Sequence, residues 1–300
     1  MLPVSVLRAQ DSGELTFKSG VSNVRIDVQV TTANGDLITD LTKDDFGVFD
    51  EGKKQPIVYF GHDSEPLSLL LLLDVSGSTR QYLQQIASVA QQSLRYLRIK
   101  DRVAVMLFAR NTRVCLPWAD DRSAVAASLR QASGDASLGA GTNINDALLA
   151  AAKYIDETSG ETGRRAVLII TDNLGLNYKS PDSPVIDAMF QADTVVNAIV
   201  IGKGQRPEAV SGGQYSNPDF TSPDVFRISE ETGGEAVQAS RVEQSFATMI
   251  ERIRTRYALH YNKPESAATG FRHVTVMLSP QARMRYPDAV LRYRRGYRVH

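Results

Sequence analysis

The spacing of hydrophobic residues changes twice along the chain. Residues 24–30 (VRIDVQV) alternate apolar and polar positions, and alternation returns after residue 256 in YALHY, HVTVML and AVLRYRRGYRV. Residues 44–60 read as two short extended pieces around a Glu-Gly-Lys-Lys turn. Alternation of this kind is typical of half-buried strands, so both ends of the chain are predicted to be β structure.

Between residues 68 and 256, continuously apolar runs alternate with segments of helical periodicity. The predicted strands are 69–74, 102–109, 113–118, 165–171 and 194–202, and the predicted helices are 80–97, 122–132, 144–157, 183–192, 223–232 and 242–256. Strands covered on both faces lose the polar alternation, and alternating strands and helices favour a parallel sheet. The predicted fold class is therefore α/β, with a doubly wound, mostly parallel, Rossmann-like sheet and helices on both faces.

The two β segments are each too small to be stable alone. We therefore expect one small discontinuous β-sandwich domain from residues 18–62 and 257–300, with the α/β domain of residues 66–256 inserted in it. Residues 1–17 are predicted to be a flexible N-terminal tail. A chain of 300 residues with 42% hydrophobic content is long enough for two such domains.

Charge is balanced over the whole chain but not at its end. Thirty-four basic and 34 acidic residues give a formal net charge of zero, which provides no global attraction for nucleic acid or an anionic membrane. From Glu251 onward, eleven Lys or Arg face three Asp or Glu. The arginine-rich end LRYRRGYRV could contact nucleic acid, but an acidic surface on a partner or on the α/β domain itself fits it equally well. No nucleic-acid partner is expected.

Neither a membrane span nor a disulfide is expected in this chain. No apolar run approaches the roughly 18 to 20 residues that cross a bilayer, and the opening MLPVSVLRAQ is too short for a complete secretory signal. The single cysteine, Cys115, cannot form an internal disulfide or a thiolate metal site by itself. We expect Cys115 to be a small buried residue rather than a reactive thiol.

Three loops at the carboxyl ends of predicted strands carry oxygen ligands. The buried run LLLLL ends in Asp74, with Ser76 and Ser78 following two apart; GAGTNIND places Thr142 before a helix, and VLIITDN places Asp172 after another apolar strand. Ligands collect at the carboxyl ends of strands in open α/β sheets, so we expect these five side chains to converge. Two carboxylates and three hydroxyls suit Mg²⁺, with Mn²⁺ or Ca²⁺ as possible substitutes.

The same motifs resemble the metal-ion-dependent adhesion site of von Willebrand factor type A domains. DVSGS matches the DxSxS element, and Thr142 in GTN and Asp172 in TDN match the threonine and aspartate elements. The resemblance implies that Ser76 and Ser78 coordinate the ion directly and that Thr142 does so directly or through water. It also implies that Asp74 and Asp172 act mainly through water or hydrogen bonds.

This resemblance, which covers about residues 66–255, also implies a function. It implies a divalent-metal-dependent, adhesion-type protein-binding module without enzymatic activity, whose protein partner presents an Asp or Glu carboxylate to the ion. The flanking segments look like a bacterial group of von Willebrand factor A-related proteins. Members of that group are often exported, so a periplasmic, cell-surface or secreted location is expected.

Three other interpretations of the site stay open. Asp74, Ser76 and Ser78 could cap the helix that begins near Thr79. A metal-dependent phosphohydrolase also places an aspartate beside a metal at the end of a leading strand. The dehalogenase-type signature needs a second aspartate two residues later as general acid and base, and that position is Ser76 here. A metal could also be purely structural and hold three loops together while partners bind elsewhere.

Overall fold

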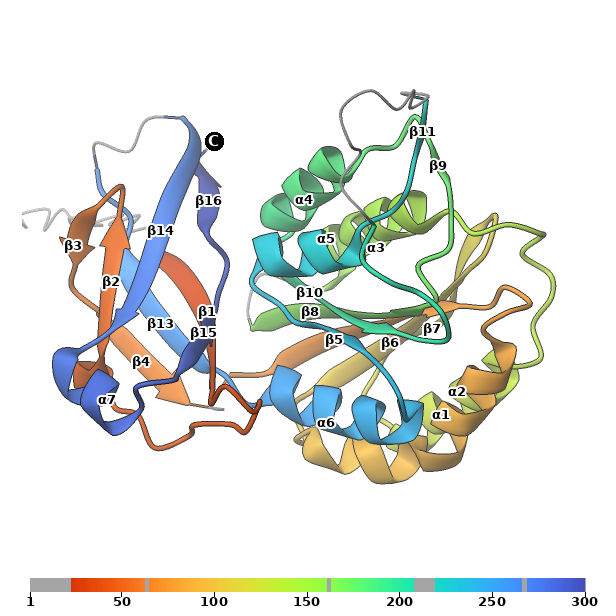
Figure 1. Ribbon diagram of the computed structural model, residues 1–300, viewed down its shortest axis with the longest axis horizontal. Coiled ribbons are helices and arrows are strands. Elements are labelled where there is room, and N and C mark those ends of the chain that lie inside the picture. The colour runs from red at the N-terminus through yellow and green to blue at the C-terminus, as the bar shows by residue number, and fades with distance from the viewer. Residues whose placement is uncertain (1–22, 63–64, 161–162, 208–218, 266–268, 300) are drawn as a thin grey trace, which may run out of the picture.

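The computed structural model describes residues 23–62, 65–160, 163–207, 219–265 and 269–299. Two units lie side by side in Figure 1, a smaller one built of antiparallel sheets and a larger one built of a helix-covered sheet. The tail predicted at residues 1–17 lies outside the described residues, as do residues 18–22.

A six-stranded sheet forms the centre of the larger unit. Its strand order is β12-β10-β8-β5-β6-β7, and all neighbours are parallel except β6 and β7. The strands are β5 (Leu67–Asp74), β6 (Arg102–Phe108), β7 (Thr112–Ala119), β8 (Arg164–Thr171), β10 (Thr194–Val200) and β12 (Ala236–Gln238). The predicted doubly wound α/β fold is confirmed. The sequence pattern missed β12, because three residues are too few to show a period.

Helices cover both faces of this sheet (Figure 1). One face carries α1 (Arg80–Ser93), α2 (Arg122–Ala132) and α6 (Val242–Arg254), and the other carries α3 (Ile144–Thr158), α4 (Asp182–Gln191) and α5 (Val225–Thr232); a 3₁₀ turn, η2 (Leu94–Tyr96), extends α1. Successive side chains of β5 alternate between the two cores, with Leu71 in one and Leu72 in the other. None of the helices in the described ranges has the length and apolar composition of a membrane span.

The winding of the sheet reverses between β5 and β8. β6 and β7 extend from β5 to one side, whereas β8, β10 and β12 extend to the other. In sheets of this kind, the crevice at the carboxyl ends of the two central strands is the usual ligand site. Asp74 ends β5 and Asp172 follows β8, so both residues lie at this reversal point.

Two four-stranded antiparallel sheets, β15-β1-β13-β4 and β16-β14-β2-β3, form the smaller unit around one shared apolar core. Their strands are β1 (Asn23–Thr31), β2 (Phe46–Asp50), β3 (Lys53–Gln55), β4 (Tyr59–His62), β13 (Tyr257–Asn262), β14 (Gly270–Leu278), β15 (Val290–Arg292) and β16 (Gly296–Val299). The short helices η1 (Lys43–Asp45) and α7 (Pro280–Arg285) connect strands. Strands from both ends of the chain thus build the small unit, while the domain boundaries given above stay a prediction.

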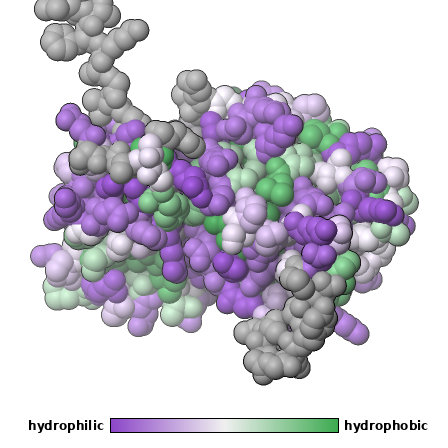
Figure 2. All heavy atoms as spheres, turned by 90° about the horizontal axis from the view of Figure 1, so that it is seen from above, coloured by the Kyte–Doolittle hydropathy of each residue, from purple (hydrophilic) through white to green (hydrophobic). Residues whose placement is uncertain are grey.

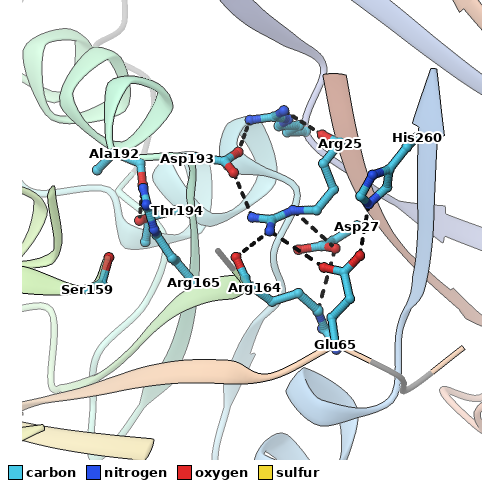
Figure 3. A network of polar contacts seen from close by, with 12 residues as sticks. Arg25, Asp27, Glu65, Ser159, Arg164, Arg165, Ala192, Asp193, Thr194 and His260 are labelled. Carbon is cyan, nitrogen blue, oxygen red and sulfur yellow. Dashed lines mark hydrogen bonds and ion pairs between the residues drawn. The ribbon is translucent and has the colours of Figure 1, made fainter. Parts of the chain in front are cut away.

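Charged residues join the two units at the amino ends of the parallel strands (Figure 3). Arg25 of β1 donates to Asp193 at 2.6 Å, and Asp27 lies 3.5 Å from the guanidinium of Arg164, the first residue of β8. The arginine-rich C-terminal segment contributes Arg294, which also binds Asp193. The α/β unit itself therefore pairs with these arginines, which was one of the alternatives left open by the sequence.

Cys115 is exposed, so the prediction that it is buried was wrong. It lies on β7, an edge strand, and its Sγ is 3.1 Å from Oγ of Ser128 on α2. Partial desolvation raises the pKa of its thiol. The protonated form therefore dominates at neutral pH, and the thiol is not activated.

Candidate metal centre

Asp74 is fixed at the carboxyl end of β5. Its side chain is fully buried. Oδ1 accepts the backbone N–H of Ser76 at 3.0 Å, and Oδ2 accepts the hydroxyl of Thr171 at 2.8 Å. Because Thr171 ends β8, the Asp74 carboxylate links the turn after β5 to the neighbouring strand.

Ser76, Ser78 and Asp172 form a connected group beside this carboxylate. The Ser76 and Ser78 hydroxyl oxygens are 3.3 Å apart, and Ser78 donates to Oδ2 of Asp172 at 2.6 Å. The other oxygen of Asp172 accepts the N–H of Leu174 at 3.1 Å. Hydrogen bonds therefore bring together four of the five predicted ligands: Asp74, Ser76, Ser78 and Asp172.

Thr142 approaches this group through the loop that contains Asp172. It is half-buried in the loop before α3, and its carbonyl oxygen lies so close to Gly175 that a Cβ there would collide with it. Gly204, after β10, is equally close to the carbonyl oxygen of Asp172. The absence of side chains at these two glycines lets the loop after β8 pack closely against the loop before α3 and against the loop after β10.

The 74–79 turn is not built as a helix cap. The N-cap residue of α1 is Thr79, whose side chain makes no capping hydrogen bond. Its hydroxyl donates instead to the carbonyl oxygens of Asp74 and Ser76, at 2.5 and 2.9 Å. The Asp74 carboxylate accepts from groups outside the helix, so the capping interpretation does not describe this turn.

Two polar residues that support the site were not predicted. One is Thr171, described above. The other is Asn145, buried in the first turn of α3, which donates from its side chain to Ser180 O at 2.7 Å and to Asp182 at 2.9 Å, and from its backbone to Asn177 Oδ1 at 3.2 Å. The signal in the sequence was a polar residue where the pattern is apolar, at the end of VLIIT and at the start of INDALLAAA.

The charges at the site favour a cation. Burial raises the pKa of Asp74 to about 6 despite hydrogen bonds from Ser76 and Thr171 that lower it, and the nearby charge of Asp172 adds to the rise. A divalent cation would offset this repulsion, and carboxylates and hydroxyls are the hard oxygen ligands that Mg²⁺ takes. The chemistry of the donor set therefore fits the ion.

The candidate centre differs from a carboxylate- or histidine-rich metal site. Within the described ranges, no group of three or more His, Cys, Asp or Glu side chains is placed to hold a metal ion. The candidate centre has two carboxylates, Asp74 and Asp172, and its other predicted ligands are the hydroxyls of Ser76, Ser78 and Thr142. Neutral hydroxyls leave more of the charge of an ion uncompensated than carboxylates would.

Comparison with known proteins places this centre within a known domain type. Residues 69–175 match the family profile of the von Willebrand factor type A domain. The matched segment begins in β5 and includes all five candidate ligands. The α/β unit therefore contains a domain of the von Willebrand factor A type. No curated protein matches the chain.

Several solved structures share the general architecture at low identity. A von Willebrand factor type A protein from Catenulispora acidiphila is 11% identical, with a TM-score of 0.47, over 92% of this chain and 73% of its own. An aerotolerance-related membrane protein from Bacteroides fragilis NCTC 9343 is 18% identical, with a TM-score of 0.47, over 62% of this chain and 98% of its own. The protein BatB from Bacteroides thetaiotaomicron is 18% identical, with a TM-score of 0.45, over 62% and 97%. Similarities at this level carry no argument about function.

Proposed function

We propose that the α/β unit is a divalent-cation-dependent, adhesion-type protein-binding module. Asp74, Ser76, Ser78, Thr142 and Asp172 would hold Mg²⁺, or Mn²⁺ or Ca²⁺ in its place, and a protein partner would present an Asp or Glu carboxylate. The observation that carries the proposal is the hydrogen-bonded series from buried Asp74 through Ser76 and Ser78 to Asp172, at the reversal point of the sheet. The domain match supports it, because von Willebrand factor type A domains commonly mediate protein–protein interactions.

In the proposed site, Asp74 provides negative charge in a fixed position and the serines provide neutral oxygen ligands. A bound Mg²⁺ would supply an electrophilic centre for a further oxygen ligand. Asp74 is oriented by the Ser76 N–H and the Thr171 hydroxyl, so its charge stays in one place. The serine hydroxyls contribute oxygens without negative charge, which leaves the site attractive to an incoming carboxylate.

The alternatives make different predictions about activity and metal dependence. A phosphohydrolase of the dehalogenase type would need a carboxylate at position 76 to act as general acid and base, whereas the Ser76 side chain here contacts the Ser78 hydroxyl. A purely structural metal would stabilise the loops, and a partner would bind elsewhere on the chain. Its affinity would then not depend on a carboxylate that coordinates the ion. We propose a non-enzymatic role on this basis.

Calorimetric titration of Mg²⁺ and Mn²⁺ into metal-stripped protein tests the proposal. We expect one saturable site in the intact chain, binding at least about tenfold weaker in Ser76→Ala, and unchanged binding in Ser88→Ala, an exposed serine of α1 that serves as a matched control. Equal affinity in Ser76→Ala would contradict the assignment. Mg²⁺-dependent turnover of p-nitrophenyl phosphate that disappears in Ser76→Ala would favour the phosphohydrolase.

We also propose that the chain acts outside the cytoplasm, in the periplasm, on the cell surface or in the medium. The proposal rests on the resemblance of the flanking segments to exported bacterial von Willebrand factor A-related proteins. Fractionation of bacterial cells that express the full gene, with the protein detected by antibody, tests it. Recovery of the protein in the cytoplasmic fraction alone would contradict it.

A further inference from the structure

After a bend at Asn173, whose φ is 54°, residues 174–178 alternate between more exposed and less exposed positions. Leu174, Leu176 and Tyr178 are 63%, 61% and 55% exposed, whereas Asn177 is buried. This every-second-residue exposure runs into the short strand β9 (Asn177–Tyr178), where successive side chains point to opposite sides. Three large apolar side chains therefore share the outer side of the segment.

The inner side of the segment is fixed against the start of α3. Gly175 lies against the carbonyl of Thr142, and Asn177 accepts the backbone N–H of Asn145 at 3.2 Å. The N–H of Leu174 donates to Asp172 at 3.1 Å. The outward side chains are therefore presented by a segment that is hydrogen-bonded to a candidate metal ligand.

A fourth apolar side chain extends the same surface. Phe220 of β11 (Phe220–Thr221) pairs with Tyr178 of β9 (Asn177–Tyr178), their ring centroids are 5.2 Å apart, and Phe220 is 46% exposed. We call Leu174, Leu176, Tyr178 and Phe220 the apolar rim.

This clustering is unusual for the larger unit. Among its described residues between 66 and 256, the exposed large hydrophobic side chains are the four of the apolar rim and Ile99. Viewed from above, the protein surface is mostly hydrophilic with small apolar areas between the polar side chains (Figure 2). Single exposed apolar side chains are ordinary, whereas contiguous apolar patches rimmed by polar residues are typical of interaction surfaces.

We propose that the apolar rim binds aliphatic or aromatic side chains of the same partner whose carboxylate reaches the metal centre. The partner is an extended protein segment that carries an Asp or Glu with an apolar residue within about two positions, because two residues of an extended chain span about 7 Å. Leu174, the first residue of the rim, lies two positions from Asp172 and donates its backbone N–H to that carboxylate, so we expect the acid and an apolar side chain to be close together in the partner. This inference rests on the proposed function.

Peptide selection with a matched control tests the inference. A display library of random 12-residue peptides is selected on the intact chain in Mg²⁺, and the selected peptides are synthesised and titrated by fluorescence polarisation. We expect selected peptides to pair an acid with a nearby apolar residue. Their affinity should fall at least about tenfold in Leu174→Ser/Leu176→Ser and stay unchanged in Ile99→Ser, an exposed apolar residue outside the rim.

Calorimetric Mg²⁺ titration of the same variants separates the two proposals. We expect the same Mg²⁺ affinity in the intact chain, the double variant and Ile99→Ser. Absent Mg²⁺ binding in the intact chain would overturn the metal-site proposal and this one with it. Normal Mg²⁺ binding, with peptides that lack apolar residues or bind the double variant equally well, would overturn only the role of the rim. Peptides whose binding requires the apolar rim but not Mg²⁺ would also overturn the proposal that one partner contacts both the rim and the ion.

Discussion

Thr171 is the residue that most directly supports the Asp74 carboxylate. It is fully buried at the end of β8, where it donates to Asp74 at 2.8 Å and accepts the N–H of Asn173 at 3.1 Å. A hydrogen bond to a charged group contributes about 1.5–3 kcal/mol. The charged form of Asp74 in its buried position therefore depends in part on this one hydroxyl.

Thr171→Val should weaken Mg²⁺ binding about tenfold, because the nearly isosteric side chain removes the donor to Asp74 without leaving a cavity. Calorimetric titration at pH 7 measures the change. Thr194→Val is the control, since Thr194 is a buried strand residue whose hydroxyl donates to Ala192 at the opposite end of the sheet. Unchanged affinity in Thr171→Val would argue against a role of the Asp74 carboxylate at the ion.

At this scale the sequence predicted which candidate ligands lie together better than it predicted the residues that hold them in place. Asp74, Ser76, Ser78 and Asp172 could be grouped because strand ends in a parallel sheet meet at one edge. The hydrogen bond of Thr171 depends on the register of β5 and β8, and that of Asn145 depends on how the 177–182 loop folds back. Neither is encoded in local periodicity.

The junction between α6 and β13 is fixed by buried charged side chains. Arg164 donates to the carbonyl oxygens of Ile253 and Arg254 at the end of α6, at 2.6 and 2.7 Å. Its Nε lies 3.5 Å from Asp27 of β1, and both side chains are buried. One arginine thus holds the last turn of a helix of the α/β unit against the first strand of the small unit.

Arg164→Met should lower the free energy of unfolding by about 3–5 kcal/mol, because it leaves the charge of Asp27 buried without this partner. Urea unfolding measures the loss. Arg165→Met is a matched control on the same strand, where we expect about 1 kcal/mol because its guanidinium hydrogen-bonds to backbone carbonyls near the surface. A loss in Arg164→Met no larger than in the control would contradict the assignment.

Asp27 also predicts how stability depends on pH. Burial alone would raise the pKa of Asp27, but the charges of Arg164 and Arg25 hold it below its ordinary value of 3.8. Its contribution to stability is therefore fully present above about pH 5 and is lost as the pH falls from there through the lowered folded-state pKa. The urea midpoint should fall between pH 5 and pH 2 more steeply in the intact protein than in Asp27→Asn. Equal slopes would show that Asp27 does not titrate with folding.

Over the whole molecule, the candidate metal centre and the small unit lie at opposite ends of the parallel sheet. The small unit lies beside the amino ends of the parallel strands (Figure 1), and its Asp27 contacts Arg164, the first residue of β8. Asp74 ends β5 and Asp172 follows β8, so both lie at the carboxyl ends. The eight residues of β5 span about 25 Å between these ends. Among the described residues, the small unit therefore contacts the end of the sheet opposite the candidate metal centre.

Asp193 should matter more to the association of the two units than the more exposed ion pairs. Its carboxylate binds both Arg25 and Arg294, whose side chains are only 13% and 12% exposed. Asp193→Asn should lower the free energy of unfolding by about 2 kcal/mol, because it weakens two charge-assisted hydrogen bonds while Asn, like Asp, tolerates the φ of 49° at this position. Asp187→Asn, which weakens a more exposed pair with Arg298, should cost under about 1 kcal/mol. Equal losses would mean that Asp193 is not a specific link.

The arrangement of the two units could be predicted only in outline. The change of hydrophobic period predicted a doubly wound sheet and the use of both chain ends in a β unit. The contacts of Arg25 and Arg294 with Asp193 join residues more than 100 positions apart, and the sequence showed only that the C-terminal segment is basic. Long-range ion pairs depend on the docking of finished elements, which local patterns do not determine.

We propose that Asp74, Ser76, Ser78, Thr142 and Asp172 together hold one divalent cation. Anomalous diffraction from crystals of the full chain grown in MnCl₂ can test this, because Mn²⁺ replaces Mg²⁺ and can be located by its own signal. We expect one strong peak within direct coordination distance of the Ser76 and Ser78 hydroxyls, about 2.1 Å, beside Asp172. A peak elsewhere on the chain, or none at saturating Mn²⁺, would contradict it.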